Sequence, residues 1–300
     1  MRRGNKLNYR EFIAAVRKEL MKRLPDGVSV HVLNVSKNNG VTMKALAVRR
    51  GEENLCPMIS LEPCYQMAVS GRPLDGIVDE IISLASLRPS RAVSSRIFFD
   101  FTEASERIAY RLVSTAANAD LLKQVPHREF LDFSLIYYLS IAFDGSRRGS
   151  CVICNQHLKG WGVTESQLYR AAASNTPKML PPVSIPIEKV LSSAIIGSEQ
   201  KTDAAAGLTV LTNRDNLYGD AVVLYPGFLR NTARLFGCDL FLLPSSVHEF
   251  LALPVTAGIS GAECRRIVIS VNRTAVEEED VLSDHVYRYV RDLDRMVTDQ

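Results

Sequence analysis

Long hydrophobic runs are missing from this sequence, although 46% of its 300 residues are hydrophobic. It contains no stretch of 18 consecutive apolar residues, whereas a helix that crosses a lipid bilayer needs about 20. The first residues, from Met1 to Lys6, lead into a mixed polar pattern rather than into the apolar core of a signal peptide. We therefore expect a cytoplasmic protein that has no membrane partner.

Cysteine is also sparse. The chain has 6 cysteines, and several of them lie inside apolar runs. Small secreted domains that depend on disulfides contain a much higher proportion of cysteine. A chain of this length can bury roughly three quarters of the surface that its unfolded form exposes, so it needs no covalent cross-links to fold. We expect reduced thiols.

The signatures of the common enzyme classes are absent as well. The sequence has no glycine-rich phosphate loop followed by Lys and Ser or Thr, and no dinucleotide-binding fingerprint. It also lacks a Gly-x-Ser-x-Gly segment and a His-Glu-x-x-His segment. These absences disfavour catalysis without excluding it, and they lead us to expect neither a cofactor nor a bound metal ion.

The distribution of charge is more informative than the net charge of +3. Residues 1–50 contain 12 Lys and Arg against 3 Asp and Glu, a local balance of +9, whereas residues 251–300 contain 6 against 9. A basic segment can form a surface for a nucleic acid or an acidic protein. It can equally be a solvated helix face that docks near the acidic C-terminal segment. No aromatic residue lies between Arg17 and Arg50 to stack on bases, which favours the second interpretation.

Hydrophobic periodicity predicts an α+β protein with mainly antiparallel sheets and packed helices. Apolar residues recur at helical spacing from Asn8 to Leu24 and again from Leu74 to Leu87. Residues 28–35 and 41–48 alternate instead, and they flank an Asn-Gly pair that favours a hairpin turn. With a short strand before the second helix, these elements predict a helix–hairpin–strand–helix unit over residues 1–90.

Residues 91–300 are predicted to form a larger α+β unit. A polar stretch rich in serine and arginine, at residues 88–96, is the candidate boundary. A long apolar run at Leu131–Phe143 predicts a central strand that pairs with the strand after it. The other predicted elements are helices at Thr102–Thr115, from Thr164, at Ile187–Ala194, Phe228–Phe236 and Gly261–Asn272, strands at Leu208–Thr212 and Ala221–Tyr225, and a hairpin of Asp239–Leu243 with His248–Leu253.

Cys151 and Cys154 have the spacing of a redox or zinc-binding motif, and His157 follows three residues later. The pattern places both cysteines in a strand, where residues three apart point to opposite faces. Two such thiolates would not reach one tetrahedral ion, and no second Cys-x-x-Cys motif supplies the remaining ligands. We therefore interpret them as thiols of the core.

The segment from Pro244 to Glu249 is the most prominent polar cluster of the sequence. Its serines suit a turn, and alternation along the following strand brings either His248 or Glu249 to the covered face of a sheet. A hydrolase would use Ser246 as the nucleophile and His248 or His127 as the base. Glu249 would then orient that base. The alternative is a structural turn, because catalytic triads are usually assembled from distant segments.

Several short segments occur along the chain in an order that is specific as a set. They include Asn38-Asn39-Gly40-Val41, Leu61-Glu62-Pro63, Val125-Pro126-His127-Arg128, Trp161-Gly162-Val163-Thr164, Asn175-Thr176-Pro177, Leu211-Thr212-Asn213, Leu217-Tyr218-Gly219, Leu224-Tyr225-Pro226-Gly227, Leu243-Pro244-Ser245-Ser246-Val247-His248-Glu249 and Leu282-Ser283-Asp284. Together they resemble the uncharacterised family called domain of unknown function 5688, over nearly the whole chain. The resemblance implies a cytoplasmic protein of anaerobic Gram-positive, Clostridia-type gut bacteria. It implies no activity.

These observations predict a non-catalytic binding or regulatory protein of the cytoplasm. The prediction depends on the missing catalytic signatures, the basic N-terminal face and the polar segments at the ends of predicted elements. One alternative is a cofactor-independent hydrolase that uses the cluster of Ser246, His248 and Glu249. Another is a nucleic-acid-binding protein that uses the basic face from Arg10 to Arg50.

Overall fold

The computed structural model describes residues 7–51, 56–87, 95–143, 148–194 and 207–299. The chain divides into two compact units. Unit 1 comprises residues 1–37, 41–97 and 140–150, and unit 2 comprises residues 38–40, 98–139 and 151–300. Most of the polar stretch at 88–96 falls outside the described residues, so a boundary near residue 90 stays a prediction. Within the described ranges, no helix has the length and apolar character that crossing a membrane requires.

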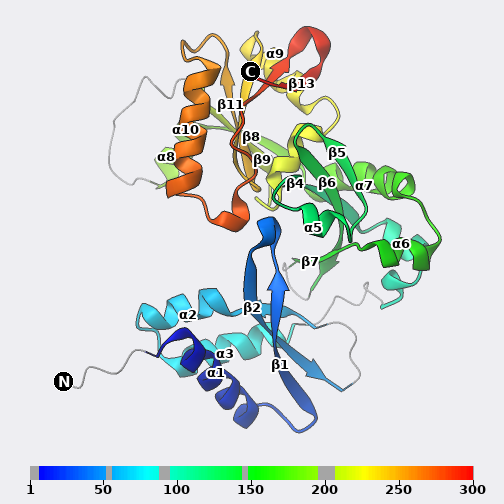
Figure 1. Ribbon diagram of the computed structural model, residues 1–300, viewed down its shortest axis with the longest axis vertical. Coiled ribbons are helices and arrows are strands. Elements are labelled where there is room, and N and C mark those ends of the chain that lie inside the picture. Colours follow the sequence, from blue (N-terminus) through cyan, green and yellow to red (C-terminus); the bar gives the residue numbers. More distant parts are fainter. Residues whose placement is uncertain (1–6, 52–55, 88–94, 144–147, 195–206, 300) are drawn as a thin grey trace. The chain divides into compact units, whose positions relative to one another are not determined.

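Unit 1 is built on a three-stranded antiparallel sheet in the order β1-β2-β3. Its helices lie on one face of this sheet (Figure 1), and the core between them contains Phe12, Leu46 and Ile77, all fully buried. The elements are α1 (Tyr9–Arg23), β1 (Val28–Ser36), β2 (Thr42–Arg50), β3 (Met58–Ser60), α2 (Leu61–Val69) and α3 (Leu74–Ala85), followed by the 3-10 helix η2 (Ser95–Phe98).

Helix α1 begins at the predicted place because Asn8 and Glu11 cap it reciprocally. The Asn8 side-chain oxygen accepts a hydrogen bond from the Glu11 backbone N–H at 2.9 Å. The Glu11 carboxylate in turn accepts one from the Asn8 backbone N–H, also at 2.9 Å. Such a capping box satisfies two backbone donors that a helix start otherwise leaves unpaired.

The predicted hairpin of β1 and β2 is confirmed. Val30 pairs with Val48 and faces the core with it, as alternation along the two strands requires. The turn is the 3-10 helix η1 (Asn38–Gly40), where the φ angles of Asn39 and Gly40 are 58° and 72°. Asn and Gly adopt this left-handed region more readily than other residues.

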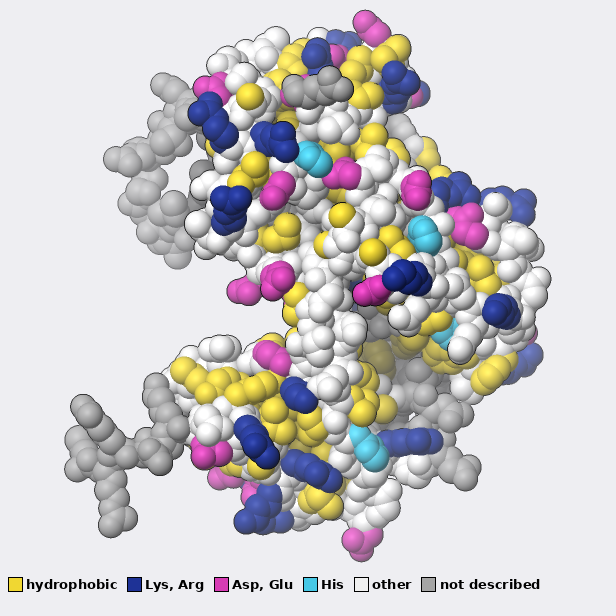
Figure 2. Space-filling model, in the orientation of Figure 1, with side chains coloured by type: hydrophobic (Ala, Val, Ile, Leu, Met, Phe, Trp, Pro, Cys, Tyr) yellow, Lys and Arg dark blue, Asp and Glu magenta, His cyan; other side chains and the backbone are white. Residues whose placement is uncertain are grey.

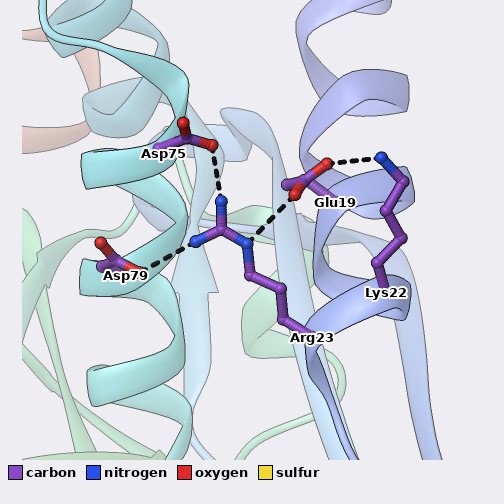
Figure 3. A network of polar contacts seen from close by, with 5 residues as sticks. All are labelled: Glu19, Lys22, Arg23, Asp75 and Asp79. Carbon is purple, nitrogen blue, oxygen red and sulfur yellow. Dashed lines mark hydrogen bonds and ion pairs between the residues drawn. The ribbon is translucent and has the colours of Figure 1, made fainter.

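The basic end of α1 is neutralised inside unit 1. The Arg23 guanidinium forms ion pairs with Glu19 on its own helix and with Asp75 and Asp79 on α3 (Figure 3), at 3.1, 2.5 and 3.0 Å. Lys22 also pairs with Glu19, at 2.9 Å. Figure 2 accordingly shows Lys and Arg side chains of unit 1 among acidic and hydrophobic ones.

The described residues after 98 contain two further antiparallel sheets, which completes the predicted α+β class. A four-stranded sheet has the order β4-β6-β5, with β7 also paired to β6, and a six-stranded sheet has the order β13-β12-β10-β11-β9-β8. The elements are α4 (Phe101–Ser105), β4 (Ile108–Ser114), α5 (Ala119–Leu122), β5 (His127–Phe130), β6 (Phe133–Ala142), β7 (Arg148–Val152), α6 (Asn155–Trp161), α7 (Glu165–Met179), β8 (Pro182–Pro186), α8 (Ile187–Ala194), β9 (Thr209–Asn213), η4 (Gly219–Leu224), α9 (Phe228–Phe236), β10 (Leu240–Ser246), β11 (Glu249–Pro254), α10 (Gly261–Thr274), η5 (Glu278–Asp280), β12 (Tyr287–Val290), η6 (Arg291–Leu293) and β13 (Arg295–Thr298).

Two sequence predictions for unit 2 are wrong. The helix expected at 102–115 is the short α4 followed by strand β4, which pairs with β6 along its whole length. The strand expected at 221–225 is instead part of the 3-10 helix η4. In both cases contacts with distant segments outweigh local propensity. Most apolar side chains of each segment are buried, so tertiary packing decides which secondary structure forms.

We predict that replacing Phe12 with Ala destabilises the protein by about 3–5 kcal/mol, because the fully buried ring leaves a cavity in the core of unit 1. Met21 lies on the same helix but is 62% exposed, so Met21→Ala is the matched control and should change stability by less than about 0.5 kcal/mol. Urea unfolding measures both. Equal effects of the two substitutions would contradict this description of the core.

Candidate functional site

The polar segment predicted as a site forms the tight turn between β10 and β11. Ser246 pairs with Glu249 across the turn. The Ser246 hydroxyl oxygen accepts a hydrogen bond from the His248 backbone N–H at 3.1 Å. The carbonyl oxygen of Asp280 accepts one from the Val247 N–H at 2.9 Å and fixes the turn against the segment before β12. These contacts engage Ser246 with the backbone of His248 rather than with its ring.

The His248 ring contacts residues of two other segments. Its Nε2 atom lies 3.7 Å from a carboxylate oxygen of Asp280. Its plane is nearly parallel to the ring of Tyr218, at 10°, with a centroid distance of 6.5 Å. The structure therefore brings His248 beside Asp280 and Tyr218, whereas the sequence pattern proposed Glu249 as its partner.

Tyr218 connects the turn to the four-stranded sheet. The guanidinium carbon of Arg111, on β4, lies 4.5 Å from the centroid of the Tyr218 ring, within the range of a cation–π contact. The Tyr138 ring, on β6, meets the same tyrosine edge to face at 5.3 Å. Arg111 and Tyr138 share one face of the sheet, because they lie opposite Ile136 and Ala109 in the register.

His127 lies on this same face of the four-stranded sheet. It is directly opposite Ile136, which is in turn directly opposite Arg111, so the three residues form one row across β5, β6 and β4. Strand spacing puts about 10 Å between the backbones of His127 and Arg111. The His127 ring Nδ1 atom lies 3.1 Å from the carbonyl oxygen of Val125. The described contacts do not join His127 to Ser246, and the hydrolase interpretation stays a prediction.

Asp220 lies beside Arg111 and is completely buried. Burial raises the pKa of the Asp220 carboxyl well above its ordinary value. The positive charge of Arg111 and weak hydrogen bonds from the backbone N–H groups of Ala221 and Leu112, which fall short of ordinary hydrogen-bond geometry, lower the pKa but do not offset that rise. Burial therefore favours the neutral form of this carboxyl group, which weakens the negative charge that Arg111 faces from it.

Unpaired polar atoms concentrate in Arg111, Asp220 and His248, and together with Tyr218, whose ring contacts Arg111 and His248, these residues form what we call the Arg111–His248 group. In the described part of the chain, eight buried side-chain nitrogen or oxygen atoms have no hydrogen-bond partner. Four of them belong to this group, namely Arg111 Nε, both carboxyl oxygens of Asp220 and His248 Nδ1. Folded proteins pair nearly all buried polar atoms, so such a concentration marks a candidate binding site.

A second polar cluster in unit 2, around Asp132, is fully hydrogen-bonded, in contrast to the Arg111–His248 group. The Asp132 carboxylate accepts hydrogen bonds from Ser283 at 2.9 Å and from Tyr287 at 2.5 Å, and it lies 2.9 Å from His285 Nδ1. Burial raises the pKa of Asp132, but these hydrogen bonds outweigh it and hold the pKa below its ordinary value. The polar atoms of this cluster satisfy one another, which is typical of a structural cross-link.

The arrangement around Tyr218 requires a glycine at the next position. A Cβ atom on Gly219 would overlap with the backbone oxygen of His248 and the hydroxyl of Thr212. That hydroxyl donates to the same His248 oxygen at 2.7 Å. Tyr218 itself has a positive φ of 50°, which a residue with a side chain rarely adopts. The loop is thus held tightly against the β10–β11 turn.

The Cys-x-x-Cys prediction needs a correction. Strand β7 ends at Val152, and Cys154 is the N-cap of α6, so the two cysteines are not both in a strand. The argument that they point to opposite faces is therefore wrong. Across the described ranges, no three His, Cys, Asp or Glu side chains gather as the ligands of a metal ion would.

A family model described as Family of unknown function (DUF5688) matches residues 9–291, nearly the whole chain. The chain belongs to this family. No curated protein matches the chain, and no solved structure matches it either.

Segments that carry the resemblance to the DUF5688 family meet in space at this site. Thr212, Gly219 and His248 come from three of them, and they are in mutual contact. Sequence reasoning therefore found the β10–β11 turn but missed Arg111 and Asp220. Each of those two is a lone charged residue within an apolar run, and that signal could have identified both.

We predict that Gly219→Ala destabilises the protein by about 1–3 kcal/mol or more, because the added methyl group overlaps with backbone and side-chain oxygens. Gly160 is the control, because a Cβ there meets nothing within 4 Å. Gly160→Ala in helix α6 should leave stability unchanged or raise it by up to about 1 kcal/mol. Thermal unfolding distinguishes the two, and a neutral Gly219→Ala would contradict the packing of this loop.

We also predict that Asp220→Asn stabilises the protein at neutral pH. The unfolded carboxyl ionises near its ordinary pKa of 3.8, while the folded one stays neutral to a much higher pH. Raising the pH above 3.8 therefore lowers the folding stability, because the unfolded state gives up its proton while the folded state keeps it. Below 3.8 both states are protonated and this loss disappears. The advantage of the Asn variant should grow from pH 4 toward pH 7. Urea unfolding over this range measures it, and a constant difference would refute the assignment.

Proposed function

We propose that this member of the DUF5688 family is a non-catalytic binding protein, and that its unit 2 binds a small anionic molecule at the Arg111–His248 group. The observation that carries the proposal is the concentration of unpaired buried polar atoms in that group. Because the fold leaves these atoms without partners, a ligand can supply the hydrogen bonds that they lack.

The charge of the group favours an anion. Burial favours the neutral form of Asp220, and no acidic side chain forms an ion pair with Arg111 anywhere in the described ranges. A carboxylate or phosphate oxygen could accept a hydrogen bond from Arg111 Nε, and the protonated Asp220 carboxyl could donate another. The half-buried rings of Tyr218 and His248 form the outer part of the site.

The contacts of the β10–β11 turn favour a binding site over a catalytic site. A serine nucleophile needs a base at its hydroxyl, but the Ser246 oxygen accepts the backbone N–H of His248. The basic face between Arg10 and Arg50 is also less suited to a nucleic acid than its composition suggests, since Lys22 and Arg23 pair with acidic residues of unit 1. Both alternatives therefore have less support than a small-anion site.

Calorimetric titration with inorganic phosphate, citrate and glutamate tests the proposal. At least one of these anions should bind the wild-type protein, and Arg111→Gln should weaken that binding by about 10- to 100-fold, as expected for the loss of a charged hydrogen bond. Arg111→Lys, which keeps the charge, should lose less than the Gln variant does.

The matched control is Arg170→Gln, which removes the same charge from an exposed position on α7. It should bind like the wild type, which excludes an effect of net charge alone. Circular dichroism establishes that each variant is folded. The proposal fails if none of the three anions binds, or if Arg111→Gln and Arg170→Gln bind equally well.

A further inference from the structure

Cys151 and Cys154 lie at the junction where strand β7 ends and helix α6 begins. Cys151 is the penultimate residue of β7, and Cys154 occupies the N-cap of α6. Both sulfur atoms lie 3.9 Å from the same backbone oxygen, that of Val152. The two sulfurs therefore cannot be farther apart than twice that distance, and both side chains are half-buried rather than sealed in the core.

We propose that Cys151 and Cys154 are a redox-active pair that forms a reversible intramolecular disulfide with low-molecular-weight disulfides such as oxidised glutathione. The chain turn between them brings both thiols next to the same Val152 carbonyl oxygen, and we infer that rotations of the two side chains bring the sulfurs within bonding distance. This inference is independent of the proposed anion site.

The exchange proceeds in two balanced steps. The thiolate of one cysteine attacks a sulfur of the glutathione disulfide, forms a mixed disulfide and releases one glutathione thiol. The thiolate of the other cysteine then attacks the protein sulfur of that mixed disulfide and releases the second glutathione. The two protein thiols lose two protons and two electrons, and the glutathione disulfide gains them as it becomes two thiols.

The thiol environment favours the oxidised form once it is made. Burial raises the pKa of both thiols, and the neighbouring Cys154 raises that of Cys151 further. Ionisation therefore does not stabilise the reduced pair, in contrast to strongly oxidising pairs whose reduced form is stabilised. For the same reason the exchange should be faster at mildly alkaline pH.

The single tryptophan of the chain reports on this pair. His157 Nδ1 accepts a hydrogen bond from the Cys154 backbone N–H at 2.9 Å. The His157 ring stacks on Trp161, with centroids 5.6 Å apart and planes at 25°. A new covalent bond at Cys154 forms next to this contact, so oxidation should change the fluorescence of Trp161.

The test incubates the folded, reduced protein with oxidised glutathione at mildly alkaline pH and maps the products by peptide mass spectrometry. We expect the Cys151–Cys154 disulfide to exceed glutathione adducts of these cysteines by about tenfold, because attack within the chain has a high effective concentration. Trp161 fluorescence should change in parallel and recover with a reducing agent.

Cys151→Ser and Cys154→Ser should each retain a stable glutathione adduct on the remaining cysteine and lose the reversible bridge. Cys238→Ser is the matched control, because Cys238 is a half-buried thiol elsewhere in unit 2 that lies 3.8 Å from the Thr256 hydroxyl. It should form the bridge like the wild type. Two separate glutathione adducts in the wild type, or thiols that stay reduced in the folded protein but form the bridge in urea, would overturn the proposal.

Discussion

The burial of the Asp220 carboxyl beside Arg111 is the constraint on which the candidate site depends. The backbone of Ala221 and Leu112 and the charge of Arg111 do not offset the cost of burying this carboxyl, so burial favours its neutral form and the cation next to it is poorly balanced. The Asp132 cluster shows that the same fold can satisfy a carboxylate completely. The difference between the two aspartates distinguishes a site that is available to a ligand from a cross-link of the fold.

The elements around Asp220 hold this arrangement in place. Gly219 lets the η4 segment approach the β10–β11 turn closely enough for the Thr212 hydroxyl and the His248 oxygen to meet. Tyr218 can then contact both Arg111 and His248. Three segments that are distant in the sequence thus form one polar group, and two of its four residues, Tyr218 and His248, lie in segments that carry the resemblance to the DUF5688 family.

Local signals in the sequence predicted part of this structure. The helical spacing that starts at Asn8 and the Asn-Gly turn of the first hairpin act within a few residues, and the predicted helix and hairpin are confirmed. Strand β4 and the helix η4 depend on partners elsewhere in the chain, so their local patterns predicted the wrong type of secondary structure. The turn at Ser246–Glu249 was found for its polarity, whereas Arg111 and Asp220 were missed, and only the fold shows that these two lone polar residues of separate apolar runs lie side by side.

The ionisation of Asp220 can be measured directly by a carbon-13 NMR titration of aspartate carboxyl groups, with Asp220→Asn to assign the signal. The account predicts that this carboxyl ionises at a pH well above that of exposed aspartates, which ionise near 3.8. An Asp220 signal that titrates with the exposed groups would show that its charge is stabilised within the fold. That result would contradict the interpretation of the Arg111–His248 group as a site with unbalanced positive charge.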